Sequence, residues 1–289
     1  MPSKYMNTIS GKLPIMGLLL LGGVATAQTL THVTVNDPRP LAAIALEIER
    51  LSGLPVNYED VPYENAADLE DVTAKIMNAA QQAQAVPGVR VIVPKGGQLV
   101  APIPLGPNGT LPDVVSTLSA LLSAVSGYHA SPAFPSRFTV SETNGVLYIQ
   151  PDQVLGRNGQ MRKVVPVLYT PITIESKRRT ALDALAVLTD QLSKTSGAKV
   201  EIGTVPIQAF AISQVTIGAT AQPAVQVLTK LLASMNVGTM SYSMLFDPRQ
   251  KFYALNIHAL PNSTSPVTSN RSLPTVPQSS AEGVYFKKR

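Results

Sequence analysis

The sequence contains no cysteine and no tryptophan, and only 5% of its residues are aromatic. The absence of cysteine excludes disulfide bridges, thiolate metal sites, a cysteine nucleophile and a lipid anchor attached to cysteine. Charged residues make up only 14% of the 289 residues, whereas 45% are hydrophobic. The chain must therefore be stabilised by its hydrophobic core, and its length suffices for one large domain or two small ones.

Motifs of the common catalytic families are also absent. The sequence has no Gly-x-Ser-x-Gly elbow, no His-Glu-x-x-His pair, no phosphate-binding loop and no dinucleotide fingerprint. His32, His129 and His258 are widely separated, and none has a second histidine or a carboxylate at metal-ligand spacing. We therefore expect no cofactor and no metal, and we do not expect an enzyme.

The N-terminal residues follow the pattern of a secretory signal peptide. Lys4 and Lys12 precede the apolar run Leu13–Val24, and residues 25–27 form an Ala-x-Ala cleavage site. The apolar run is only about half of the roughly 20 residues that span a bilayer. We expect residues 1–27 to be removed, leaving a periplasmic or secreted protein of the bacterial cell envelope with no transmembrane segment.

A helix followed by a short strand is predicted twice in the remaining chain. In the first copy, apolar residues recur at helical spacing after Asp37, an expected N-cap, and Pro38. Gly53 is expected to end this helix in a left-handed conformation, and residues 54–58 read as a strand. The same pattern recurs 144 positions later and ends at Gly197.

A second helix and a hairpin follow in each copy. The helix predicted over residues 110–125 has an apolar face that is matched 110 positions later. The first hairpin turns at Asn144-Gly145, a strong hairpin signal, and the second turns at residues 247–250. We therefore predict an α+β fold of two tandem small βαββαββ domains, the first with an insertion between its helices.

Composition and spacing also predict the domain boundaries. The expected segments are a first domain at 28–151 with an insertion at about 60–95, a linker at 152–163, a second domain at 164–260 and a disordered tail at 261–289. Inside the insertion we predict an additional helix over residues 68–84 and two strands over residues 86–93 and 98–103.

The charges are divided unevenly along the chain. Residues 28–156 carry twelve acidic and six basic side chains, whereas residues 157–289 carry six acidic and fifteen basic ones. Opposite charges would favour packing of the two halves or head-to-tail association of molecules. The alternative interpretation is that these residues form ordinary solvated surfaces.

Three groups of residues are candidates for partner binding. The acidic cluster begins with Glu59 and Asp60 and continues to residue 71; it is expected as a solvated acidic surface, with a calcium site or an acid–base pair as the alternative. A basic patch is predicted at the start of the second copy's first helix. The third group is the apolar strand of the insertion, because the insertion is the main difference between the copies. The last two groups comprise Lys177, Arg178, Arg179, Val89, Val91 and Val93.

The repeated pattern resembles the secretin and TonB short N-terminal (STN) domain. The resemblance rests on PLAAIALEIERLSGLPVNY, TLPDVVSTLSALLSAVSG and VLYIQP in the first copy, and on TALDALAVLTDQLSKTSGAKVEI, QPAVQVLTKLLASMN and FYALNI in the second. Together these segments cover roughly residues 30–260. The resemblance implies a periplasmic interaction module. The long insertion departs from the family pattern, and residues 261–289 contain no secretin pore or receptor barrel.

Two classes of function follow from these observations. The first is a non-enzymatic adaptor or scaffold that binds an envelope or periplasmic protein, or a second copy, through the edges of its sheets. The alternative is an exported hydrolase or glycan-modifying enzyme with a site between the domains, which requires two close carboxylates or a histidine–carboxylate pair. Nucleic acid is not an expected partner, because the protein is exported and few aromatic residues accompany its basic ones.

Overall fold

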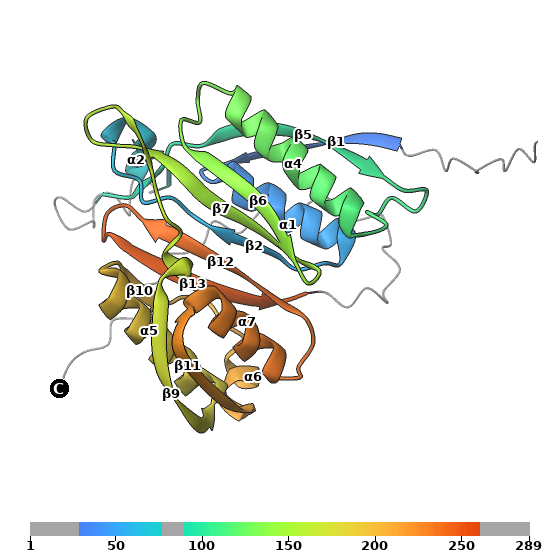
Figure 1. The fold of residues 1–289 in the computed structure, drawn as a ribbon. Coiled ribbons are helices and arrows are strands. Elements are labelled where there is room, and N and C mark those ends of the chain that lie inside the picture. Colours follow the sequence, from blue (N-terminus) through green and yellow to red (C-terminus); the bar gives the residue numbers. More distant parts are fainter. Residues whose placement is uncertain (1–28, 77–89, 261–289) are drawn as a thin grey trace, which may run out of the picture.

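The computed structural model describes residues 29–76 and 90–260, so the predicted signal peptide and tail lie outside the described residues. The described chain combines helices with several sheets, which confirms the predicted α+β class. We call residues 29–163 the N-terminal half and residues 167–260 the C-terminal half (Figure 1). No helix in the described ranges is both long and apolar enough to cross a membrane.

The N-terminal half has a long strand, a helix and a short strand before the insertion, and a strand, a helix and a hairpin after it. Its elements are β1 (Thr29–Asp37), α1 (Pro40–Ser52), β2 (Val56–Glu59), η1 (Ala66–Asp68), β3 (Leu69–Asp71), α2 (Thr73–Ile76), β4 (Ile92–Pro94), β5 (Gly97–Leu105), α4 (Val114–Ala130), β6 (Arg137–Thr143), β7 (Val146–Leu155) and β8 (Met161–Lys163).

The C-terminal half begins with a short 3₁₀ helix and then alternates strands and helices. Its elements are η2 (Val167–Tyr169), β9 (Pro171–Thr180), α5 (Ala181–Ser196), β10 (Lys199–Ile202), α6 (Ile207–Ile212), β11 (Gln214–Pro223), α7 (Ala224–Ser234), β12 (Met240–Asp247) and β13 (Phe252–Ala259).

One seven-stranded sheet runs through both halves. Its strand order is β10-β13-β12-β2-β7-β6, and β8 pairs with β7 beside this path. The halves meet where β12 lies parallel to β2. Three further sheets in the described ranges have two antiparallel strands each, β1 with β5, β9 with β11 and β3 with β4. The two halves therefore share one continuous sheet rather than being joined only by a linker (Figure 1).

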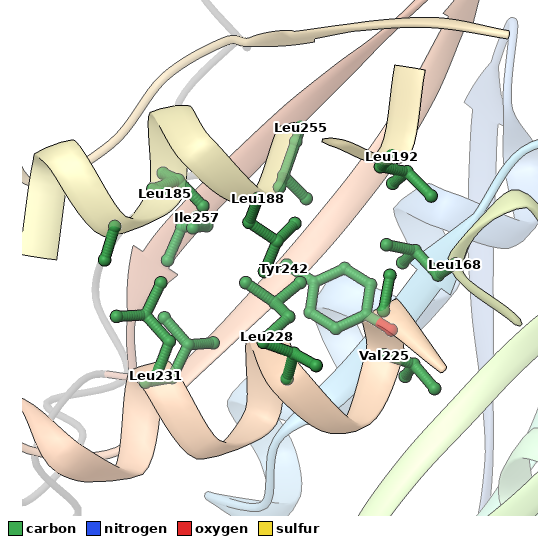
Figure 2. Close-up of a cluster of buried hydrophobic side chains, with 14 of the residues drawn as sticks. Leu168, Leu185, Leu188, Leu192, Val225, Leu228, Leu231, Tyr242, Leu255 and Ile257 are labelled. Atoms are coloured by element: carbon green, nitrogen blue, oxygen red, sulfur yellow. The ribbon is translucent and has the colours of Figure 1, made fainter. Parts of the chain in front are cut away.

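Each half places its helices where they contact strands of different sheets. In the N-terminal half, α1 packs against β1 and β2, while α4 packs against β5 and β6. In the C-terminal half, α5 contacts β9 and β10, and α7 contacts β11. Figure 2 shows leucines of α5 and α7 pointing toward one another around Tyr242, Leu255 and Ile257 of β12 and β13. Each half thus has its own hydrophobic core.

The buried faces of the helices recur at constant spacing in the two halves. The residues buried along α1 at positions 40, 41, 44, 45 and 48 are matched 144 positions later in α5. Both helices end at a left-handed glycine, Gly53 with φ 67° and Gly197 with φ 73°, as predicted. The six positions that define the buried side of α4 are matched 107 positions later, at Ala224, Val227, Leu228, Leu231, Leu232 and Met235. The predicted spacing of 110 was therefore wrong by three residues, about one helical turn.

Several local predictions differ from the structure. Helix α1 begins at Pro40, and its N-cap is Arg39, whose side chain makes no capping bond; Asp37 instead accepts a hydrogen bond from the Arg39 N–H at 2.7 Å. Residues 68–76 of the predicted helix over 68–84 form the end of η1, β3 and α2, and its remainder, residues 77–84, lies outside the described ranges. The expected linker at 152–163 is a hairpin, because β7 extends to Leu155 and β8 pairs back onto it.

Candidate functional site: the junction of the two halves

The junction is built on the parallel pairing of β2 with β12. Ser243 lies opposite Tyr58, Met244 lies opposite Glu59, and the Asp60 N–H donates to the Met244 carbonyl at 2.8 Å. All four residues of β2 are buried, since β7 covers its other side. The polar side chains of this strand, and that of Asp60 directly after it, are therefore carried into the interior.

Asp60 is fully buried and its carboxylate collects four donors. Oδ1 accepts from the Tyr58 hydroxyl at 2.9 Å and the Tyr63 hydroxyl at 2.8 Å. Oδ2 accepts from Arg39 Nε at 2.7 Å and from the Phe246 backbone N–H at 3.2 Å. Since Phe246 belongs to β12, the carboxylate joins both halves, and we call these five residues the Asp60 clasp.

Arg39 completes the Asp60 clasp from the other side. Its Nη2 donates to the Phe246 carbonyl at 2.7 Å, so one residue of β12 has both of its backbone groups bound by this ion pair. Burial alone would lower the pKa of Arg39, but attraction to Asp60 outweighs it and raises that pKa above its ordinary value. Burial and the Asp60 charge also raise the pKa values of Tyr58 and Tyr63 well above the ordinary range.

Glu59 is a second buried carboxylate at the same junction. It accepts hydrogen bonds from the backbone N–H groups of Val167 and Leu168, at the start of the C-terminal half. Burial raises its pKa to about 8, and the two backbone donors only partly offset that shift. Burial, followed by the Glu59 charge, also raises the pKa values of Tyr242 and Tyr253. Glu59 is therefore protonated at neutral pH. Its hydrogen bonds tie β2 to η2.

A histidine–carboxylate pair lies farther along the junction. His258 Nε2 lies 2.6 Å from Oε1 of the buried Glu49 and 2.9 Å from Oγ of Ser241. Both contacts converge on the same ring nitrogen, whereas a serine–histidine–acid relay needs the acid and the serine on opposite nitrogens. Ser241 is also fully buried. This arrangement is suited to holding the halves together rather than to nucleophilic catalysis.

One further side chain binds across the junction, whereas a further ion pair lies within the N-terminal half. Asn57 Oδ1 accepts from the Tyr242 backbone N–H at 2.9 Å, and thereby extends the backbone pairing by one residue. Arg162 of β8 pairs with Glu64, and its Nε lies 3.1 Å from Glu64 Oε2. The Glu64 and Arg162 side chains are 29% and 47% exposed, in contrast to the buried Asp60 clasp.

The candidate partner-binding residues do not form one surface. Glu59 and Asp60 were expected on a solvated acidic face, but their exposures are 2% and 0%, because β12 and β7 enclose the strand that carries them. This corrects the prediction for these two residues, whose carboxylates are committed to bonds inside the fold. The rest of the acidic cluster lies apart from the junction core, and Glu70 and Asp71 pair locally with Lys75 and Arg90.

The other candidates that lie in the described ranges are not part of the seven-stranded sheet. Val89 is outside the described residues. Val91 and Val93 are half-buried, and Val91 bonds through its N–H to Thr73 Oγ1 and through its carbonyl to the Val72 N–H. Lys177, Arg178 and Arg179 lie on β9 rather than at the start of α5, where Thr180 provides the N-cap instead. Lys177 and Arg178 are exposed, whereas Arg179 is half-buried and donates to the Glu175 carbonyl.

Sequence reasoning missed Arg39, Glu49 and His258 as junction residues. One usable signal was present: Glu49 follows Ile48 on the apolar side of a helix, where an unpaired carboxylate would be costly. In the described ranges, no group of three or more His, Asp or Glu side chains is placed to hold a metal ion. Comparison with known proteins found no matching family model, no matching curated protein and no matching solved structure.

Proposed function

We propose that this chain is a non-enzymatic interaction module of the bacterial cell envelope, an adaptor or scaffold built from two divergent copies of an STN-like βαββαββ unit. The recurrence of the buried faces of α1 in α5 and of α4 in α7 supports the duplication. The matching glycine caps support it independently. An envelope location follows from the expected signal peptide and the resemblance, and remains part of the proposal.

The observation that carries this proposal is the use of the buried ionisable groups. Asp60, Arg39, Glu59 and Glu49 are each bonded to residues of the other half or of the same clasp. Groups committed in this way stabilise a rigid two-unit body and are not available for proton transfer to a substrate. Binding through strand edges is also the way in which the two halves of this chain bind each other.

The experiment is capture of envelope proteins by the immobilised full chain, quantified against the same amount of heat-denatured chain. An adaptor should retain a small set of proteins that the denatured chain does not retain, and soluble folded chain should release them. If the same background is recovered on both matrices, the adaptor proposal fails.

The hydrolase alternative is favoured by one observation, the Glu49–His258 pair at 2.6 Å drawn from the two halves. Its test is turnover of a panel of glycan and ester substrates by the purified chain, with Glu49→Gln and His258→Gln as variants. Turnover that both variants abolish without unfolding would favour the enzyme over the adaptor. We expect no turnover, because the only serine in contact with His258 in the described chain, Ser241, is buried.

A further inference from the structure

Strand β1 has a long edge that no other strand of the described chain covers. It pairs with β5 over nine consecutive residues without a register shift. In the described ranges, no strand pairs with its other side. Nine residues at about 3.4 Å each give an edge roughly 30 Å long.

Two prolines on β5 establish which backbone groups of β1 point outward. Pro104 lies opposite Leu30 and Pro102 lies opposite His32. Because proline has no N–H, these pairs are the non-hydrogen-bonded ones of the antiparallel ladder, in which the N–H and C=O groups point away from the partner strand. By the same alternation, the backbone N–H and C=O groups of Thr34 also point away from β5. The β1 residues whose backbone groups face the open edge are Leu30, His32, Thr34 and Asn36.

The outer edges of β5, β10, β6 and β9 each carry a recognisable protective device. Pro102 and Pro104 block the edge of β5. Ser193 Oγ accepts the Val200 N–H of β10 at 2.9 Å, and His129 Nε2 accepts the Phe138 N–H of β6 at 3.0 Å. Strand β9 has two register shifts in its pairing and two exposed cations. Bulges, charges and prolines are the usual means of preventing edge-to-edge association, and β1 has none of them along its open edge.

The side chains of β1 also remain incompletely covered. Val33 and Val35 are half-buried, whereas Ile172 and Ile174 of β9 are 1% and 6% exposed. On α1, which packs against β1, Leu46 is 57% exposed. A further strand beside β1 would cover apolar surface as well as satisfy backbone groups.

We propose that β1 pairs antiparallel with β1 of a second copy, about a two-fold axis that passes through Val33. In this register His32 lies opposite Thr34 of the second copy, and Leu30 lies opposite its Asn36. The two-fold axis repeats both pairs, and the resulting four hydrogen-bonded pairs supply about eight backbone hydrogen bonds. The two Val33 side chains meet on the half-buried face.

A second copy fits this edge because the edge is self-complementary. The one charged residue of β1, Asp37, would lie opposite Thr29 of the other copy rather than another carboxylate. An isologous contact of this kind closes after two molecules, so it produces a dimer and not a fibre. The inference names a partner for the proposed interaction module and rests on that function, but the two are tested by different measurements.

The first test compares two matched proline variants by sedimentation velocity over a range of concentrations. Thr34 and Val100 lie opposite each other in the β1–β5 pair, and the N–H groups of both point away from the ladder. Thr34→Pro should raise the dissociation constant of the dimer by at least about tenfold, since it removes hydrogen bonds at the new interface. Val100→Pro, on the blocked edge of the same sheet, should change it by less than about twofold. Salt should have little effect because the edge is uncharged.

The second test uses the absence of cysteine from the natural chain. Facing residues of a non-hydrogen-bonded pair have Cα atoms about 4.5 Å apart, which a disulfide can bridge. Val33→Cys should therefore form a covalent dimer under mild oxidation, whereas Val100→Cys, 45% exposed in the same sheet, should not.

The outcomes separate the inference from the proposed function. Dimerisation that Thr34→Pro abolishes, together with cross-linking at residue 33, supports the pairing. A monomer at all concentrations without that cross-link overturns it. So does a dimer that Thr34→Pro leaves intact or that high salt dissociates. In a third outcome the natural chain is a monomer, it captures envelope proteins, and Thr34→Pro abolishes that capture. This result overturns the second copy as the occupant of the edge while leaving the adaptor function in place.

Discussion

Replacing Asp60 by asparagine should lower the free energy of unfolding much more than the loss of one surface carboxylate does. The Asp60 carboxylate is fully buried and accepts from Arg39, Tyr58, Tyr63 and Phe246. Asparagine has the same shape but no charge, and its amide nitrogen would face donors. The Arg39 side chain, 19% exposed, would then hold an uncompensated charge beside β12.

The expected loss follows from the cost of breaking a buried ion pair. Removing one partner of such a pair costs about 3–5 kcal/mol, because the other charge is left without compensation. Glu64→Gln is the matched control, since it removes a carboxylate from an arginine pair whose side chains are 29% and 47% exposed. That substitution should cost less than about 1 kcal/mol. The losses in the free energy of unfolding caused by the two substitutions should therefore differ at least threefold.

Urea unfolding of the full chain measures both losses, with circular dichroism to verify that each variant is folded in the absence of urea. Adding Arg39→Met to Asp60→Asn should recover part of the loss, because it removes the unpaired cation; the double variant should lose less than the sum of the single ones. An Asp60→Asn variant within about 1 kcal/mol of the natural chain would refute this reasoning. So would equal losses in Asp60→Asn and Glu64→Gln.

Two further predictions concern pH and backbone packing. Burial raises the pKa of Glu59 to about 8 from an ordinary value of 4.5, so between these pH values the folded protein holds a proton that the unfolded chain releases. The free energy of unfolding should therefore fall as the pH rises from about 4.5 to 8, by at most roughly 5 kcal/mol. Urea unfolding at pH 5 and pH 9 should show this fall in the natural chain and lose most of it in Glu59→Gln; an equal fall in both would assign it to other groups. A Cβ at Gly218 would lie 2.6 Å from Ser176 Cβ, so Gly218→Ala should cost about 1–3 kcal/mol in the same assay. The matched change Gly106→Ala, with 3.4 Å to its nearest atom, should cost less than about 1 kcal/mol, and equal losses would contradict the packing argument.

The elements of the fold could be predicted where their signal is local. Helical spacing of apolar residues located α1, α4, α5 and α7. The left-handed glycines Gly53 and Gly197 and the Asn144-Gly145 turn follow from backbone conformations that few other residues adopt; the φ angles of Asn144 and Gly145 are 54° and 78°. The one-turn error in matching α4 to α7 has a simple cause. Both helices are apolar around much of their circumference, so several alignments superimpose leucines equally well.

The candidate site could not be predicted because its partners are distant in the sequence. Asp60 binds Phe246, 186 positions away, and Glu49 binds His258, 209 positions away. Sequence patterns indicate that β2 is a short strand but not which strands flank it. As the edge of an isolated unit β2 would expose Glu59 and Asp60, which is why they read as part of a solvated acidic surface. The docking of β12 makes β2 a central strand and buries both carboxylates.

The matched positions Glu49 and Ser193 differ in a way that serves the junction. Both side chains accept the backbone N–H of the strand that follows their helix, Glu49 from Val56 at 3.1 Å and Ser193 from Val200 at 2.9 Å. A serine suffices for that bond, and at β10 it also closes an outer edge. The longer glutamate makes the same bond with Oε2 and reaches His258 of the other half with Oε1. Because the local role is the same in both halves, the additional reach of Glu49 is explained by the junction alone. Glu49→Ser should therefore retain the bond to Val56 while weakening the attachment of the C-terminal half.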